Sequence, residues 1–171
     1  MFKFAQSGPV VGKADVTVMK DVESVFRFVS DDFFRNYPRW SPEVEKLEPL
    51  SEGPLKLGSV ARQVRTDQGH RTQSTFRVIE HRVNERVAFK GTSDPYRCTY
   101  EFRAADPPPS TRLTFTFELS EIELFMRPFE KLIRVAIQDG AQRTVRNIKN
   151  LLESPTSDKP SDEDAIRPLI G

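Results

Sequence analysis

The last third of the sequence carries the clearest pattern of apolar and polar positions. Between residues 126 and 152, apolar side chains recur every three or four residues, and polar side chains occupy most positions between them. This spacing places the apolar side chains on one stripe of an α-helix. Pro128 near the start and Pro155 beyond the end are typical of helix boundaries. At ~1.5 Å per residue we expect a helix of about 40 Å, which needs a large apolar partner surface.

Upstream of this helix, apolar and polar residues alternate with the period of two that is typical of half-buried strands. Residues 14–18 predict a first strand. A helix N-cap at Asp21 then predicts a short helix, and residues 31–37 predict a second one that ends before Pro38. Turn residues separate six further predicted strands, over residues 44–50, 59–66, 71–83, 86–92, 96–104 and 111–120.

Strands that follow one another in hairpins form an antiparallel sheet, and its apolar face must be covered. We therefore predict an α+β fold with a curved antiparallel sheet of about seven strands wrapped around the long C-terminal helix. Two short helices follow the first strand. Residues 1–9 are interpreted as an N-terminal arm, residues 10–153 as one ligand-binding domain, and residues 154–171, rich in Ser, Pro and charged side chains, as a disordered tail.

Composition narrows the function. The chain has 26 Lys and Arg against 25 Asp and Glu, so we expect no nucleic-acid partner. A lone cysteine, Cys98, and a start without a long apolar segment predict a cytoplasmic protein. Two histidines and one cysteine without metal-ligand spacing predict no metal site. No phosphate loop or dinucleotide fingerprint is present, and we expect no cofactor.

Three short motifs, together with the order of elements, resemble the START-like (SRPBCC) superfamily. They are the Trp40-Ser41-Pro42 turn after the paired helices, the Leu57-Gly58 start of a strand, and the hairpin from Val78-Ile79-Glu80-His81 to Arg86-Val87-Ala88-Phe89. The chain is most similar to the bacterial polyketide cyclase/dehydrase branch, over about residues 10–153. The resemblance implies the helix-grip fold of START and Bet v 1-like proteins, with a pocket between the sheet and the C-terminal helix. Because members include lipid carriers, hormone receptors, allergens, quinone-binding proteins, aromatase/cyclases and co-chaperone activators, the resemblance implies no single reaction.

Alternation along the strands and the helical stripe predict which side chains face this pocket. Most of them are apolar, so a hydrophobic ligand such as a lipid, a quinone or an aromatic polyketide is expected. A core packed solid by the 13 phenylalanines is an equally good interpretation of the same pattern. The predicted ligand-binding residues are Arg62, Val64, Phe76, Val78, Phe89, Tyr100, Phe102, Phe115, Phe117, Ile133, Ala136, Ile137 and Gly140.

Four of the candidate residues carry particular expectations. Arg62 is predicted to grip a carboxylate or phenolate of the ligand, although Glu80 is an alternative partner and a one-residue shift in register would turn Arg62 to solvent. Tyr100 either orients a ligand oxygen or belongs to the core. Gly140 either leaves room for a ligand or lets the helix pack closely on the strands. His81 is predicted to lie on the outer face of the sheet, exposed to solvent, with a general base as the alternative.

Three functions remain open from the sequence. The leading hypothesis is a binder or carrier of a hydrophobic small molecule. The first alternative is a cyclase, aromatase or dehydratase that uses the same pocket, and the second is a protein-interaction or regulatory module. Phe33, Phe34, Leu124 and Phe125 belong to apolar segments that either form a gate, a peripheral membrane contact or a dimer surface or are simply buried in the core. The protein is predicted to be a monomer or a homodimer.

Overall fold

The computed structural model describes residues 8–155. Its seven strands form one antiparallel sheet in the order β1-β7-β6-β5-β4-β3-β2. From β2 to β7, each strand pairs with the next strand in the chain, and β1 pairs with β7. The strands are β1 (Val10–Val18), β2 (Val44–Pro49), β3 (Val60–Asp67), β4 (His70–Arg82), β5 (Arg86–Gly91), β6 (Tyr96–Ala105) and β7 (Ser110–Leu119). The predicted α+β helix-grip fold is confirmed.

The helices fall close to where the sequence pattern places them, although the long helix predicted from residue 126 begins at Glu130, after a 3-10 turn. Two short helices, α1 (Val22–Phe26) and α2 (Phe33–Trp40), follow β1 and are joined by the π-helical turn η1 (Arg27–Asp31), while the 3-10 turn η2 (Leu124–Phe129) leads into the long helix α3 (Glu130–Glu153). Asp21 caps α1, because its carboxylate accepts a hydrogen bond from the Ser24 backbone N–H at 2.8 Å. The predicted arm and tail lie mostly outside the described residues and stay predictions.

Helix α2 runs further than the sequence predicts. The prediction ended it before Pro38, yet the helix continues to Trp40, and the Ser41 N–H donates to the Tyr37 carbonyl at 3.0 Å. Tertiary contacts explain the difference, since Trp40 is only 1% exposed and its carbonyl accepts a hydrogen bond from the Asn147 side chain of α3 at 3.0 Å. Burial of this indole outweighs the hydrogen bond that a proline removes from a helix.

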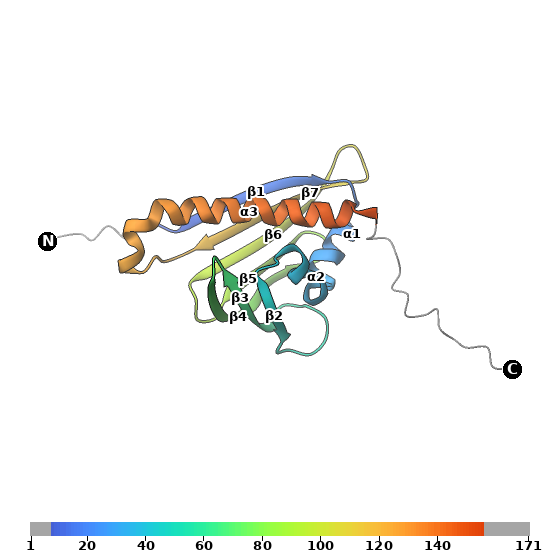
Figure 1. Ribbon diagram of the computed structural model, residues 1–171. Helices are drawn as coiled ribbons and strands as arrows, with labels where there is room; N and C mark the ends of the chain where they lie inside the picture. The colour runs from blue at the N-terminus through green and yellow to red at the C-terminus, as the bar shows by residue number, and fades with distance from the viewer. Residues whose placement is uncertain (1–7, 156–171) are drawn as a thin grey trace.

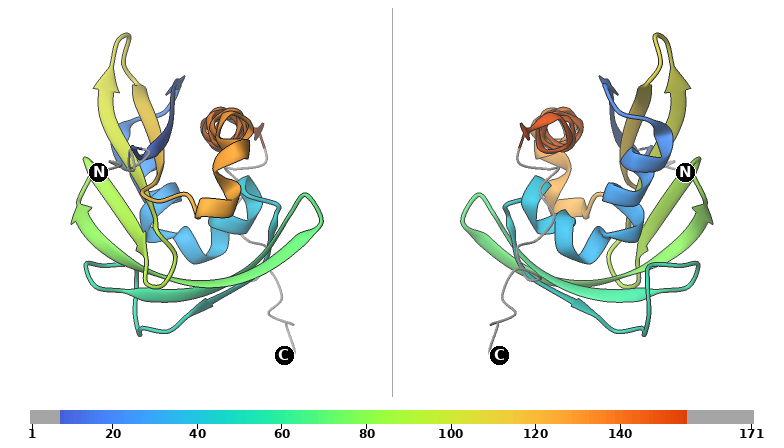
Figure 2. Two further views of the ribbon diagram at one scale, coloured as in Figure 1. Left: turned by 90° about the vertical axis from the view of Figure 1, so that its left-hand side faces the viewer. Right: turned by 90° about the vertical axis from the view of Figure 1, so that its right-hand side faces the viewer.

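Helix α3 lies along the free edge of β1 (Figure 1). The Gln138 side chain behaves like a strand residue, since its amide accepts from the Lys13 N–H at 3.0 Å and donates to the Lys13 carbonyl at 2.9 Å. Nearer the C-terminal end of the helix, Lys149 donates to the Thr17 carbonyl at 2.6 Å. Viewed end-on, the sheet curves like a trough, and α3 lies over its opening (Figure 2). The helix is therefore anchored on one side of the trough.

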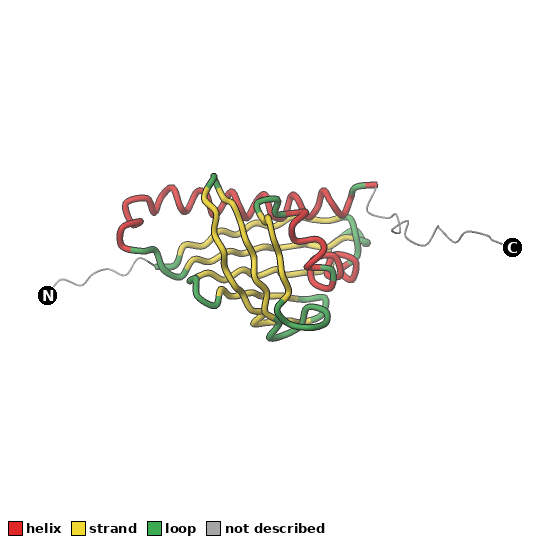
Figure 3. The backbone as a smooth tube through the Cα atoms, turned by 60° about the horizontal axis from the view of Figure 1, so that its bottom comes forward, coloured by secondary structure: helices red, strands yellow, loops and turns green. Residues whose placement is uncertain are grey.

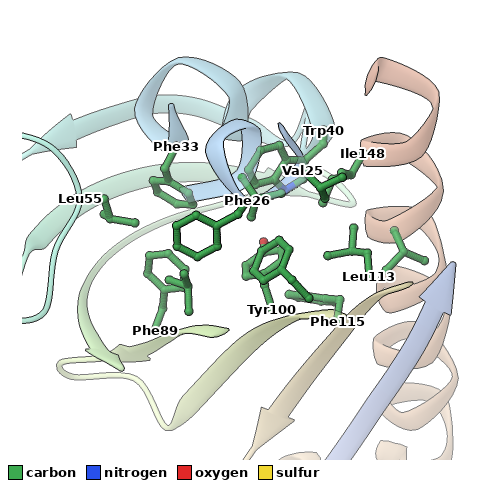
Figure 4. Close-up of a cluster of buried hydrophobic side chains, with 14 of the residues drawn as sticks. Val25, Phe26, Phe33, Trp40, Leu55, Phe89, Tyr100, Leu113, Phe115 and Ile148 are labelled. Carbon is green, nitrogen blue, oxygen red and sulfur yellow. The ribbon is translucent and has the colours of Figure 1, made fainter. Parts of the chain in front are cut away.

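The short helices fill one end of this trough (Figure 3). Side chains from α1, η1 and α2 pack there against the sheet and the C-terminal half of α3, and Figure 4 shows part of this cluster. Its most completely buried members include Val25, Val29, Trp40, Phe89, Leu113 and Ile148. This packed end holds α2 and the middle strands rigidly against each other, which positions the side chains that face the remaining space.

A β-bulge in β4 changes which residues face the interior. The register of the β4–β5 ladder shifts between Val78 and Glu80, so the side chains after the bulge change faces. The prediction that His81 lies on the outer face is therefore wrong. Its Nε2 lies 3.1 Å from the Ser30 hydroxyl, and its ring meets Phe26 edge to face at 5.6 Å.

Candidate functional site

The part of the trough that the short helices leave open contains a cavity of about 670 Å³. Rings from α2 and the middle strands form its floor, and small side chains of α3 form its roof. Eight of the predicted ligand-binding residues line this cavity, namely Phe76, Phe89, Tyr100, Phe115, Phe117, Ala136, Ile137 and Gly140. The interior is thus not packed solid. Whether these side chains bind a ligand stays a prediction.

The structure contradicts the predicted position of Arg62. Its side chain is 44% exposed and forms an ion pair with Glu48 at 3.3 Å on the outer face of the sheet. The inner positions of β3 are instead Gln63 and Arg65, which line the cavity. Val64 shares the phase of Arg62 and, although it is buried, does not line the cavity either. The sequence assignment of β3 was out of register by one residue, and a one-residue slip reverses both faces.

Three other predicted residues lie apart from the cavity. Val78 and Phe102 are buried in the packed core, and Phe102 meets Phe26 of α1 edge to face at 5.2 Å. Ile133 is half-buried on α3, outside the cavity lining. The cavity therefore occupies less of the inner surface than the alternation alone suggests, because α1 covers the end of β6 that carries Phe102.

A charged side chain lies in the cavity wall where the sequence analysis did not place one. The Arg65 guanidinium binds Asp67 through two hydrogen bonds, of 3.1 Å from Nε and 3.0 Å from Nη2. Its Nη1 donates to the Tyr37 hydroxyl at 2.8 Å and to the Ser41 hydroxyl at 3.1 Å. Burial lowers the pKa of Arg65, but Tyr37 and Asp67 outweigh burial and raise it overall. Arg65 therefore stays charged beside the cavity.

The polar network continues along the wall from Arg65. The Tyr37 hydroxyl donates to Gln63 Oε1 at 2.9 Å, and Gln63 Nε2 donates to the Ser74 hydroxyl at 3.2 Å and lies 3.5 Å from the Tyr96 hydroxyl. Burial raises the pKa of Tyr37 to about 12, so this phenol is neutral at ordinary pH. Helix α2 and strands β3, β4 and β6 thus each contribute a polar group to one wall of an otherwise aromatic cavity.

Tyr100 and Trp40 form a second polar pair, deeper in the interior (Figure 4). The indole N–H of Trp40 is buried and makes no hydrogen bond within the described residues, although it faces the Tyr100 hydroxyl. Burial raises the pKa of Tyr100 well above its ordinary value, so the phenol is neutral. Nearby, burial raises the pKa of Cys98 to about 12, which makes the thiol a small unreactive side chain.

Exposed side chains mark the opening of the cavity. Asp67, Thr72 and Gln73, at the β3–β4 hairpin, line the cavity and are exposed, as is Arg143 on the facing side of α3. Arg143 forms an ion pair with Glu43 at 3.2 Å, which links α3 to the segment before β2. A ligand would enter between α3 and this hairpin, on the side away from β1.

The apolar segments proposed for a surface role differ in exposure. Phe33 is 2% exposed and stacks on Phe89 at 4.8 Å, so its predicted surface position is wrong: it lines the cavity. Phe34 is half-buried against the core. Leu124 and Phe125, on η2, are each 71% exposed. Only these two of the four are thus available for a partner or a membrane.

Neither a metal-binding cluster nor a membrane-spanning helix is found among the described residues. Among residues 8–155, no group of three or more His, Cys, Asp or Glu side chains is arranged to hold a metal ion. In the same part of the chain, no helix has the length and apolar character needed to cross a membrane.

Comparison with known proteins identifies a family for this chain. A family model described as polyketide cyclase/dehydrase and lipid transport matches residues 9–153. The search of curated proteins found no match.

Solved structures share the fold at low sequence identity. The Zhui aromatase/cyclase from Streptomyces sp. R1128 is 16% identical, over 85% of this chain and 94% of that chain, with a TM-score of 0.70. Truncated norcoclaurine synthase from Thalictrum flavum is 13% identical, over 89% and 98%, with a TM-score of 0.66. The protein TTHA0849 from Thermus thermophilus is 18% identical, over 83% and 96%, with a TM-score of 0.65. At these identities the likenesses establish the fold alone.

Proposed function

The chain belongs to the polyketide cyclase/dehydrase and lipid transport family, and on that premise we propose that it binds a hydrophobic small molecule beneath α3. The observation that carries the proposal is the aromatic cavity of about 670 Å³. This volume falls within the roughly 300–1,000 Å³ of small-molecule sites. A ligand that buries roughly 200 Å² of apolar surface would gain about 5 kcal/mol before the costs of association. Lipids, quinones and aromatic polyketides fit this description.

The direct experiment is native mass spectrometry of freshly purified protein, followed by titration with the neutral dye N-phenyl-1-naphthylamine. Trp40 is the chain's single tryptophan and lines the cavity, so its fluorescence reports on this site alone. We expect one dye molecule per chain, with quenching of Trp40 emission. A protein that carries no co-purified compound and leaves Trp40 emission unchanged at saturating dye would refute the proposal.

An enzyme of the cyclase, aromatase or dehydratase type is the second candidate, and the polar wall favours it. Arg65 supplies a fixed positive charge that would stabilise an enolate oxygen as it forms. Tyr37, held 2.8 Å from Arg65, is a neutral phenol that would donate a proton to the same oxygen. For this the Tyr37 hydroxyl would have to leave Gln63, to which it now donates.

Substitution of Arg65 separates binding from catalysis. If the protein is an enzyme, Arg65→Met should lower the rate of cyclisation of a linear poly-β-ketone by about 10²–10³-fold, because a preorganised charge is lost. Dye affinity should change less than about threefold. Arg62→Met is the matched control, since this arginine lies three positions away in the same strand but on the outer face. If the parent protein leaves the product distribution unchanged, the enzyme hypothesis fails and the binder hypothesis stands.

A peripheral membrane contact through Leu124 and Phe125 is a further proposal. Both side chains are exposed on η2, directly before the helix that covers the cavity. We expect the parent protein to float with neutral liposomes and Phe125→Ser to reduce the floated fraction severalfold. Val83→Ser is the control, because Val83 is 67% exposed at the β4–β5 turn. Parent protein that stays at the bottom of the gradient removes the membrane option. Location in the cytoplasm and the choice between monomer and homodimer stay predictions.

A further inference from the structure

We propose that the Tyr100 hydroxyl donates a hydrogen bond to a carbonyl oxygen of the ligand. We propose further that Trp40 is the positioning residue that sets the direction of the Tyr100 O–H bond. This inference rests on the proposed binding function and deepens it. It assigns the inner end of the cavity to an uncharged ligand that carries a ketone or quinone group. The argument depends on what each of the two side chains can donate or accept.

Trp40 leaves the Tyr100 oxygen only one role. An indole N–H is a donor and never an acceptor. Trp40 is 1% exposed and its Nε1 has no hydrogen-bond partner among the described residues. It is turned toward the Tyr100 hydroxyl, with the two rings 6.0 Å apart in an edge-to-face arrangement (Figure 4). Because an indole N–H cannot accept a hydrogen bond, the Tyr100 hydrogen has no acceptor on that side and has to point elsewhere.

The remaining direction for the Tyr100 hydrogen is the cavity. Tyr100 lines the cavity, and its hydroxyl donates to no described residue. The ring itself cannot turn away, since it packs on Phe115 with centroids 4.8 Å apart and on Phe89 at 6.1 Å. The hydroxyl borders the cavity and is not among the fully buried atoms of the described residues that lack a partner, so an acceptor supplied by a ligand in the cavity would be within its reach. Burial also keeps the phenol protonated, as its raised pKa shows.

The surroundings select a neutral acceptor. The rings in contact with Tyr100 are Trp40, Phe89 and Phe115, none of which compensates a negative charge. Among the described residues, two cations line the cavity, and both are paired: Arg65 binds Asp67 through two hydrogen bonds, and Arg143 forms an ion pair with Glu43 at 3.2 Å. A carboxylate at the Tyr100 end would lose its hydration without gaining an ion pair. A carbonyl oxygen only accepts, so one donated hydrogen bond satisfies it.

A pair of probes with the same ring skeleton tests this inference on the intact protein. Fluorene is a hydrocarbon, and 9-fluorenone adds a single carbonyl oxygen to it. We expect the parent protein to bind fluorenone about five- to tenfold more tightly by equilibrium dialysis, the ratio that one net hydrogen bond gives. In Tyr100→Phe the ratio should fall to about one, with fluorene affinity within about twofold of the parent.

A second readout distinguishes positioning from packing. The carbonyl stretching band of bound fluorenone should lie at lower frequency in the parent protein than in Tyr100→Phe, because a hydrogen bond weakens the C=O bond. Trp40→Phe keeps an aromatic ring but removes the N–H, and should reduce both the band shift and the affinity ratio. Thr99→Val removes a buried hydroxyl from the neighbouring position of β6, outside the cavity lining, so it is the control and should leave both unchanged.

Four results of these measurements would overturn the inference about Tyr100. Equal affinities of the two probes for the parent protein, or an unshifted carbonyl band, would overturn the inference and leave the proposed binding function standing. A ratio that persists in Tyr100→Phe would also overturn it. A parent protein that binds neither probe would overturn both proposals. The parent measurements need no variant, so a variant that failed to fold would not remove the test.

Discussion

Gly140→Leu should abolish dye binding while leaving the protein folded and more stable. Gly140 lines the cavity, and a Cβ built at this position meets no atom within 4 Å, so an added side chain would project into the ligand's space. Glycine in a helix interior costs about 1 kcal/mol relative to good helix formers such as leucine. The melting temperature should therefore rise by about 2–4 °C. We expect dye affinity to fall at least about 100-fold.

Dye titration and thermal unfolding followed by circular dichroism measure both effects. Gly140→Ala is the matched control, because it adds only the Cβ and should keep most of the affinity while gaining a similar stability. Unchanged affinity in Gly140→Leu would mean that the ligand does not lie beneath this part of α3.

Gly12→Ala should lower the stability of the protein, whereas Gly140→Leu should raise it. We expect the free energy of unfolding to fall by about 2–3 kcal/mol. A Cβ at Gly12 would lie 2.6 Å from Ile137 Cγ2 and 2.7 Å from the Ile137 carbonyl oxygen. The helix cannot move away easily, since the adjacent Gln138 is bound to both backbone groups of Lys13. The melting temperature should fall by about 5–10 °C.

Thermal and urea unfolding of the two variants Gly12→Ala and Gly8→Ala check this expectation. A Cβ at Gly8 meets nothing within 4 Å, so that variant should stay within about 0.5 kcal/mol of the parent. If Gly12→Ala were as stable as Gly8→Ala, the close approach of α3 to β1 would be wrong. Together, the variants at residues 12 and 140 separate the two roles that the sequence left open for a small residue at the helix. Gly12 permits close packing, and Gly140 preserves space.

The fold was predictable because two sequence patterns are strong and uninterrupted over most of their length. These are the alternation of apolar and polar residues in the strands and the apolar stripe of the long helix. Strand β7 alternates without a break, and the stripe of α3 repeats over six turns, so neither needs tertiary information. The family resemblance stated from the motifs is also confirmed by the family match over residues 9–153.

The candidate site was less predictable, and β3 shows why. Its two faces carry one arginine each, Arg62 outside and Arg65 inside, so composition does not choose between them. The valines that suggested the inner phase lie on the outer one. In β4, the bulge at Ile79 reverses the faces within a strand, and nothing local in the sequence marks it. The position of the Tyr37 side chain in the cavity wall depends on how α2 packs against the sheet, which is a property of the tertiary structure.

The way α3 meets β1 has a consequence for self-association. An uncovered strand at the rim of a sheet is a template on which another chain can extend that sheet. Gln138 and Lys149 of α3 bind three outer backbone groups of β1, at Lys13 and Thr17, so the helix stands where a second molecule would have to pair. The opposite rim, β2, is only six residues long, is irregular between Val44 and Lys46, and ends at a proline. Both edges of the sheet therefore disfavour strand-to-strand association with another copy of the chain.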